Sequence, residues 1–97
     1  MLFSITCTDK PGALATRMAT RPDHLVYLNT WAEKFTFTGP MLDAEGRPCG
    51  SLILLNAEDR AEAERFAAGD PYAKAGLFES VVIRQLRPVF RDGVLVE

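Results

Sequence analysis

Hydrophobic and polar residues alternate along the first stretch of the chain, from Leu2 to Thr8. Its apolar members alternate with hydroxyl residues, namely Phe3, Ile5 and Cys7 with Ser4, Thr6 and Thr8. A period of two residues is typical of a strand with one buried face. Three further apolar stretches predict strands, at 35–41, 51–55 and 78–90. The turn residues at 43–48 join the second and third strands into a hairpin.

The segment after the first strand predicts helix in two pieces. Asp9 is expected to cap a first helix, with Pro11 in its first turn and good helix formers over 13–19. Pro22 lacks a backbone N–H, so it is expected to kink or restart the helix. Thr20-x-x-Asp23 resembles a capping box for a second helical segment over 21–34. The apolar face of that segment has helical spacing, at Leu25, Leu28, Ala32 and Phe35.

A further helix is predicted over 57–68. Its buried face comprises Ala61, Phe66 and Ala67, and its early acidic residues suit the helix dipole. Gly69 ends it. Asp70-Pro71 then caps one more short turn, which Gly76 closes. Residues 91–97 form a tail for which the pattern predicts no element.

The order of elements is therefore β-α-β-β-α-β, which predicts an α+β, ferredoxin-like fold in a single domain over residues 1–97. Two helices would cover one face of a four-stranded antiparallel sheet. The other face mixes apolar side chains with hydroxyl residues that include Ser4, Thr6, Thr36, Thr38 and Ser80. A 97-residue chain has a small core, so a symmetric homodimer that buries this face is expected.

Composition excludes several classes of function. The formal net charge is −2 and the basic residues are dispersed, which argues against nucleic-acid binding. No apolar run approaches membrane-spanning length, and no charged leader precedes an apolar run, so we expect neither a membrane span nor a signal peptide. Two isolated cysteines, Cys7 and Cys49, favour a cytoplasmic location, and Cys7 is expected to pack in its strand. The chain has one histidine, no Cys-x-x-Cys motif and no glycine-rich phosphate loop. We therefore expect neither a metal site nor a cofactor.

His24 is the only histidine, and the predicted restart at Pro22 places it in the first turn of a helix. Positive partial charge there would favour the neutral, basic ring. Arg17 and Arg21 recur at helical spacing with it if the helix continues, and together they would form an anion-binding edge. The alternatives are an exposed helix histidine without a role and two solvated arginines.

Three other residues are candidates for a site. Asp70 is either a helix cap alone or a cap that also contacts another group, because a carboxylate has several lone pairs. Ser51, after Gly50 at a strand start, either binds a ligand or is structural. Tyr72 either lines a pocket or, more commonly for such a residue, packs.

Four segments carry a family resemblance. They are 17–25 (RMATRPDHL), Gly39-Pro40, Gly50-Ser51, and above all 70–78 (DPYAKAGLF) with the closing strand down to 88–90. In these the chain resembles the YciI-like (YCII-related) family of the dimeric α+β barrel superfamily, along nearly its whole length. The resemblance implies a homodimer with facing sheets, and a pocket with a His–Asp pair that carries over to His24 and Asp70. Similarity within the family extends to a dehydrochlorinase of hydroxylated aromatics and, at the level of the fold, to muconolactone isomerase.

The function that we expect is acid–base chemistry without a cofactor, in a lyase or isomerase acting on a small cyclic or aromatic anion. His24 would be the general base or acid and Asp70 its orienting partner. Arg17, Arg21, Ser51 and Tyr72 would contact the substrate. Two alternatives remain: a dimer that binds a small metabolite without turnover, and a structural interaction domain with a vestigial pocket.

Overall fold

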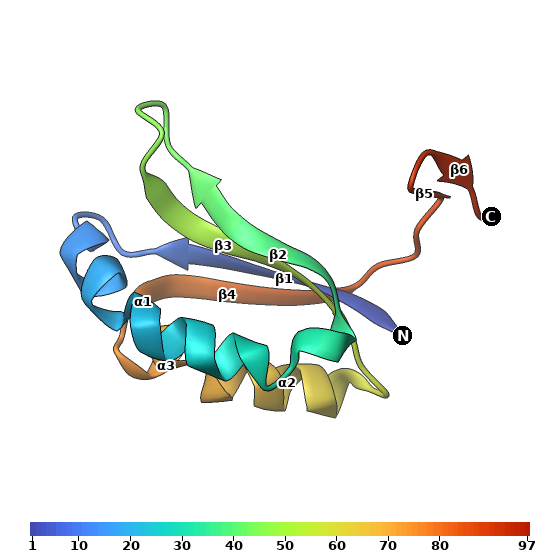
Figure 1. Ribbon diagram of the computed structural model, residues 1–97, viewed down its shortest axis with the longest axis horizontal. Helices are drawn as coiled ribbons and strands as arrows, with labels where there is room; N and C mark the ends of the chain where they lie inside the picture. Colours follow the sequence, from blue (N-terminus) through green and yellow to red (C-terminus); the bar gives the residue numbers. More distant parts are fainter.

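The computed structural model describes residues 1–97 and has the predicted ferredoxin-like order (Figure 1). Four strands form one sheet, and three helices and a 3₁₀ turn connect them. The elements are β1 (Leu2–Asp9), α1 (Leu14–Asn29), η1 (Ala32–Lys34), β2 (Phe35–Leu42), β3 (Pro48–Asn56), α2 (Arg60–Gly69), α3 (Pro71–Lys74), β4 (Phe78–Gln85), β5 (Phe90–Arg91) and β6 (Val94–Leu95). None of the helices has the length and apolarity needed to cross a bilayer.

The sheet is antiparallel, with strand order β2-β3-β1-β4, and the helices lie against one of its faces (Figure 1). Residues paired across strands share a face. Ile5 pairs with Ile53 and Cys7 with Ser51, and all four side chains are buried under the helices. The alternation in the sequence therefore predicted the core face of β1 correctly.

The core is centred on Phe66 of α2. Its ring packs edge-on against Trp31 and Phe35 and is fully buried, which is worth about 1.5–3 kcal/mol for a side chain of this size. α2 begins at Arg60 rather than at residue 57, because the carboxylate of Asp59 accepts a hydrogen bond from Glu62 N and caps the helix there. The predicted buried face was wrong at Ala61, which is exposed.

α1 is one continuous helix, so the predicted restart at Pro22 and the capping box at Thr20 and Asp23 are wrong. Pro22 lies inside the helix on its exposed side. There, water can hydrate the carbonyl that a missing N–H leaves unpaired, and the packed face of the helix tolerates the proline. His24 consequently lies more than two turns into α1 and not in a first turn, so the helix-dipole argument for its protonation does not apply.

The start of α1 also differs from expectation. Ala13 is the N-cap residue and makes no side-chain capping bond. Asp9, predicted as the cap, is instead the last residue of β1. Its carboxylate binds Arg17 on the same side of the sheet, and this charge-assisted contact outweighs a helix cap.

The last strand is shorter than predicted, because β4 ends at Gln85. The following residues, 86–97, form an arm that extends beyond the body of the protein (Figure 1). Within the arm, β5 and β6 pair as a small hairpin through a turn at Asp92 and Gly93, both with positive φ. Phe90 is 66% exposed in this hairpin.

Candidate functional site

His24 and Asp70 meet between α1 and the start of α3. Nδ1 of His24 lies 2.8 Å from Oδ1 of Asp70, and the residues are only 7% and 2% exposed. α1 supplies the ring. Asp70 is positioned by its own capping bond, since the same Oδ1 accepts a hydrogen bond from Tyr72 N at 3.0 Å. Asp70 is therefore both a helix cap and the hydrogen-bond partner of His24, which is the second of the two alternatives given for it.

The partner of Nδ1 determines which nitrogen of the neutral ring is basic. An ionised carboxylate only accepts hydrogen bonds, so Nδ1 of His24 carries the proton that it donates to Asp70. Nε2 is then the unprotonated nitrogen. This is the tautomer in which a histidine can accept a proton from a bound molecule, while its carboxylate partner holds the ring in place.

The ring of Tyr72 packs against both His24 and Arg17. Its ring stacks on the imidazole of His24, with centroids 3.8 Å apart and planes inclined by 14°. The guanidinium of Arg17 also lies over it, 4.6 Å from the centroid. Burial raises the pKa of the Tyr72 hydroxyl, against the lowering effect of Arg17 and Arg21. Tyr72 thus both packs and lines the site.

Arg17 is 4% exposed, so the solvated alternative for this residue is wrong. Its Nε and Nη2 donate to the two carboxylate oxygens of Asp9 at 2.7 and 3.0 Å, and Nη2 also donates to Ser51 Oγ at 2.8 Å. Burial acts to lower the pKa of Arg17, but the hydrogen bond and charge of Asp9 outweigh it and raise the pKa. The positive charge is therefore compensated inside the protein.

A cavity of about 460 Å³ opens beside these residues, between α1, β2 and β3. Its lining includes all the predicted site residues except Asp70, which lies behind the ring of His24. The lining residues are Arg17, Met18, Arg21, His24, Leu25, Leu28, Thr38, Gly39, Pro40, Pro48, Ser51 and Tyr72. Arg21 is exposed and forms no ion pair within the chain, unlike Arg17. The cavity thus combines apolar walls with one imidazole, the hydroxyl residues Thr38, Ser51 and Tyr72, and one free cation.

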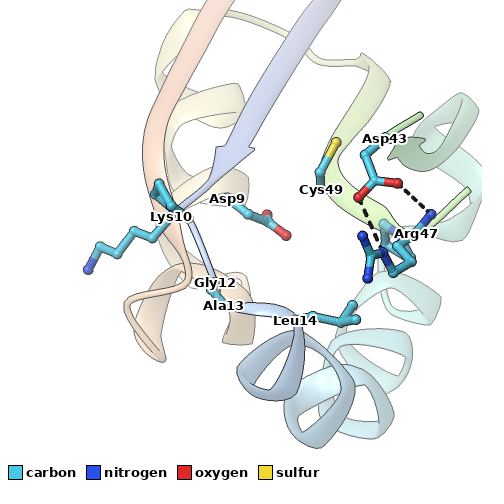
Figure 2. A pocket seen from close by; sticks show the side chains of 10 residues that line it. Asp9, Lys10, Gly12, Ala13, Leu14, Asp43, Arg47 and Cys49 are labelled. Carbon is cyan, nitrogen blue, oxygen red and sulfur yellow. Dashed lines mark hydrogen bonds and ion pairs between the residues drawn. The ribbon is translucent and has the colours of Figure 1, made fainter. Parts of the chain in front are cut away.

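A second cavity, of about 310 Å³, lies at the end of β1 (Figure 2). Asp43 and Arg47 pair with each other at its edge, and the exposed thiol of Cys49 also lines it. Asp9 lines this cavity and Arg17 lines the other, so their ion pair separates the two. The hairpin residue Pro48 borders both.

Cys7 lies beneath the site, beside Ser51 in the register of the sheet. Burial, with a contribution from the negative charge of Asp70, raises the pKa of its thiol to about 12. The thiol is therefore protonated at neutral pH and packs in the core. Across the chain, no three His, Cys, Asp or Glu side chains gather as they would around a metal ion.

The sequence interpretation missed Asp9 as part of the site. Asp9 and Arg17 belong to different elements, and no local periodicity links them. A usable signal was the burial expected for Asp9 itself, because it continues the alternation of Phe3, Ile5 and Cys7 onto the core face. A charge at such a position requires a partner.

A ferredoxin-like fold with a buried His–Asp pair beside a cavity defines a candidate acid–base site. The chain belongs to the YCII-related domain family, whose model matches residues 1–87. It is 30% identical over 98 aligned residues to Protein YciI of Escherichia coli O6:H1, which covers 93% of this chain and 100% of that protein. It is 32% identical, with the same coverage, to an uncharacterized protein of Haemophilus influenzae.

The fold and sequence are also similar to a solved enzyme structure. This is the 5-chloro-2-hydroxyhydroquinone dehydrochlorinase TftG of Burkholderia phenoliruptrix AC1100, in complex with 2,5-dihydroxybenzoquinone. The TM-score is 0.86 and the identity 34%, over 90% of this chain and 94% of that one. The family resemblance and the fold class predicted from the sequence are thus confirmed, and similarity to a lyase-type enzyme is established.

Proposed function

We propose that this protein is a cofactor-independent lyase that eliminates a leaving group from a small hydroxylated cyclic compound, with His24 as the acid–base residue. The observation that carries the proposal is the buried His24–Asp70 contact at the wall of a 460 Å³ cavity. That volume suits a single-ring compound and falls within the range of ordinary ligand pockets.

In the proposed reaction, Nε2 of His24 removes a proton from the bound ring compound. The electron pair left behind moves into the ring, and the leaving group departs with its own bonding pair. For a chlorinated hydroquinone the net change is the loss of one proton and one chloride, with no external oxidant. Asp70 holds the ring and stabilises the imidazolium that forms, and Arg21 contributes a cation for an anionic substrate. Isomerisation would use the same proton removal, with the proton returned to another atom.

The similarity to TftG supports elimination over isomerisation. That enzyme is a dehydrochlorinase of a hydroxylated, chlorinated ring, and this chain has a lined cavity of suitable size next to its only histidine. Tyr72 lines the same cavity and supports the imidazole of His24 through its stacked ring.

Chloride release from 5-chloro-2-hydroxyhydroquinone tests the proposal. We expect turnover by the wild-type protein and a loss of about 10²–10⁴ in kcat/KM in His24→Gln, because general acid–base catalysis contributes that much. Arg65→Gln, on the exposed part of α2, is the control. Binding of the compound without chloride release would favour the metabolite-binding alternative. Neither binding nor release would favour a structural domain.

We further propose that the protein, as one domain over residues 1–97, acts as a homodimer in the cytoplasm. The sheet face opposite the helices carries Phe37, Leu52, Leu54 and Val82. Phe37 is 53% exposed there, and an uncovered apolar face of this kind suits a symmetric partner. The free thiols of Cys7 and Cys49 suit a reducing compartment.

A further inference from the structure

The hydroxyl group of Ser51 has a fixed hydrogen-bond partner in the cavity wall, and the proposed reaction of His24 gives it no role. Ser51 is 3% exposed and lines the larger cavity. Its Oγ accepts a hydrogen bond from Nη2 of Arg17 at 2.8 Å. No protein atom accepts the hydroxyl proton of Ser51, so this side chain receives a hydrogen bond and has one left to donate.

Arg17 determines this direction because it cannot itself accept a hydrogen bond. Asp9 binds Nε and Nη2 through its two oxygens and compensates the charge. Arg17 is therefore a poor direct ligand for an anion. It acts instead as a fixed donor that occupies a lone pair of Ser51 Oγ and increases the acidity of the hydroxyl proton.

We infer that Ser51 donates a hydrogen bond to an oxygen atom of the bound compound, with Asp9 and Arg17 as positioning residues behind it. The hydroxyl lines the cavity, where an oxygen of a bound compound is within the class of groups that can accept its proton. The ligand class is thus a ring bearing a carbonyl or phenolate oxygen. This inference rests on the proposed function and adds the group that would stabilise negative charge on that oxygen as His24 removes a proton.

The assignment separates the two arginines that share the helix face. Arg17 acts through Ser51 on one ligand oxygen. Arg21 is the exposed cation at the cavity and attracts the negative charge of the whole compound. Loss of Ser51 should therefore weaken binding at any ionic strength, whereas loss of Arg21 should matter most at low salt.

Binding of 2,5-dihydroxybenzoquinone, measured by titration calorimetry and infrared difference spectroscopy, tests the inference. We expect Ser51→Ala to raise the Kd about ten- to a hundred-fold, as for a lost hydrogen bond to a charged acceptor. A carbonyl band of the bound compound should also shift to higher frequency, because the donor is gone. Ser51→Thr keeps a hydroxyl group, and its Kd should lie closer to that of the wild type than to that of Ser51→Ala.

Ser80→Ala is the matched control, since Ser80 lies exposed on β4 and on the opposite face of the sheet. It should bind the quinone as the wild type does. An unchanged Kd and carbonyl band in Ser51→Ala would overturn the inference and leave the chloride-release result for His24 untouched. A wild-type protein that does not bind the quinone would overturn the inference together with the proposed class of substrate.

Discussion

One carboxylate oxygen, Oδ1 of Asp70, accepts hydrogen bonds from both Nδ1 of His24 and the backbone N of Tyr72. The first contact belongs to the candidate chemistry and the second to the start of α3. The turn that begins α3 therefore also aims the imidazole. The same oxygen atom thus serves the candidate chemistry and the stability of the α3 turn. Substitutions at Asp70 can distinguish these two roles.

Asp70→Ala should destabilise the fold more than Asp70→Asn. Alanine removes the cap and leaves the buried N–H groups of His24 and Tyr72 without an acceptor, which costs about 1–3 kcal/mol. Asparagine keeps an oxygen in the same place and loses only the charge. Urea unfolding of both variants measures the difference. Equal stability of the two would show that the capping contact contributes little.

Arg17→Met should lower the free energy of unfolding by about 3–5 kcal/mol, because it leaves the carboxylate of Asp9 buried without its partner. The double variant Asp9→Leu/Arg17→Met should recover part of that loss, since both charges are then gone. Chemical denaturation of the wild type, the two single variants and the double variant gives the coupling. Additive effects would contradict a buried ion pair.

Cys49 should react with a thiol reagent in the folded protein and Cys7 should not. The pKa of the Cys7 thiol is raised to about 12 by burial, so roughly one molecule in 10⁴ carries the thiolate at pH 8. Mass spectrometry after treatment with N-ethylmaleimide should show one adduct. Cys49→Ser should show none until the protein is unfolded, and rapid labelling of folded Cys49→Ser would contradict the packing of Cys7.

The same shift has a consequence for stability at alkaline pH. The folded state holds the Cys7 proton more tightly than the unfolded state, whose thiol titrates near its ordinary value of 9.0. The free energy of unfolding should therefore fall as the pH rises from about 9 towards 12. The fall should be smaller in Cys7→Ala, and unfolding curves collected across that range compare the two proteins. Identical slopes would mean that Cys7 does not contribute.

Phe37→Glu should convert the protein from dimer to monomer. A charge in place of a half-exposed ring on the edge strand β2 opposes burial of this sheet face against a second copy. Light scattering at micromolar concentration should give twice the 10.7 kDa chain mass for the wild type and the single mass for the variant. A wild-type protein that scatters as a monomer would refute the proposed dimer.

The sequence predicted the fold well where one local rule decides the outcome. The alternation from Phe3 to Cys7 identified the core face of β1, and Asp70-Pro71 identified the cap of α3. It failed where tertiary contacts override local preference. Pro22 suggested a helix break, but its exposed position in α1 lets the helix continue, and that continuity places Arg17, Arg21 and His24 on one face.

The sequence suggested which residues belong to the candidate site, but not which of them contact one another. Helical spacing suggested that Arg17 would face solvent or an anion. Only the folded structure shows that Asp9, at the end of β1, pairs with Arg17 of α1. The direction of the Ser51 hydroxyl follows from that same contact, so no reading of neighbouring residues alone could have supplied it.

The protonation of the two ring nitrogens of His24 tests the proposed acid–base pair. With a single histidine in the chain, a long-range ¹H–¹⁵N spectrum of the neutral ring shows which nitrogen carries the proton without ambiguity. We predict a proton on Nδ1 and a bare Nε2 in the wild type, with this preference weakened in Asp70→Asn. A proton on Nε2, or a tautomer mixture that Asp70→Asn leaves unchanged, would contradict the paired, basic histidine.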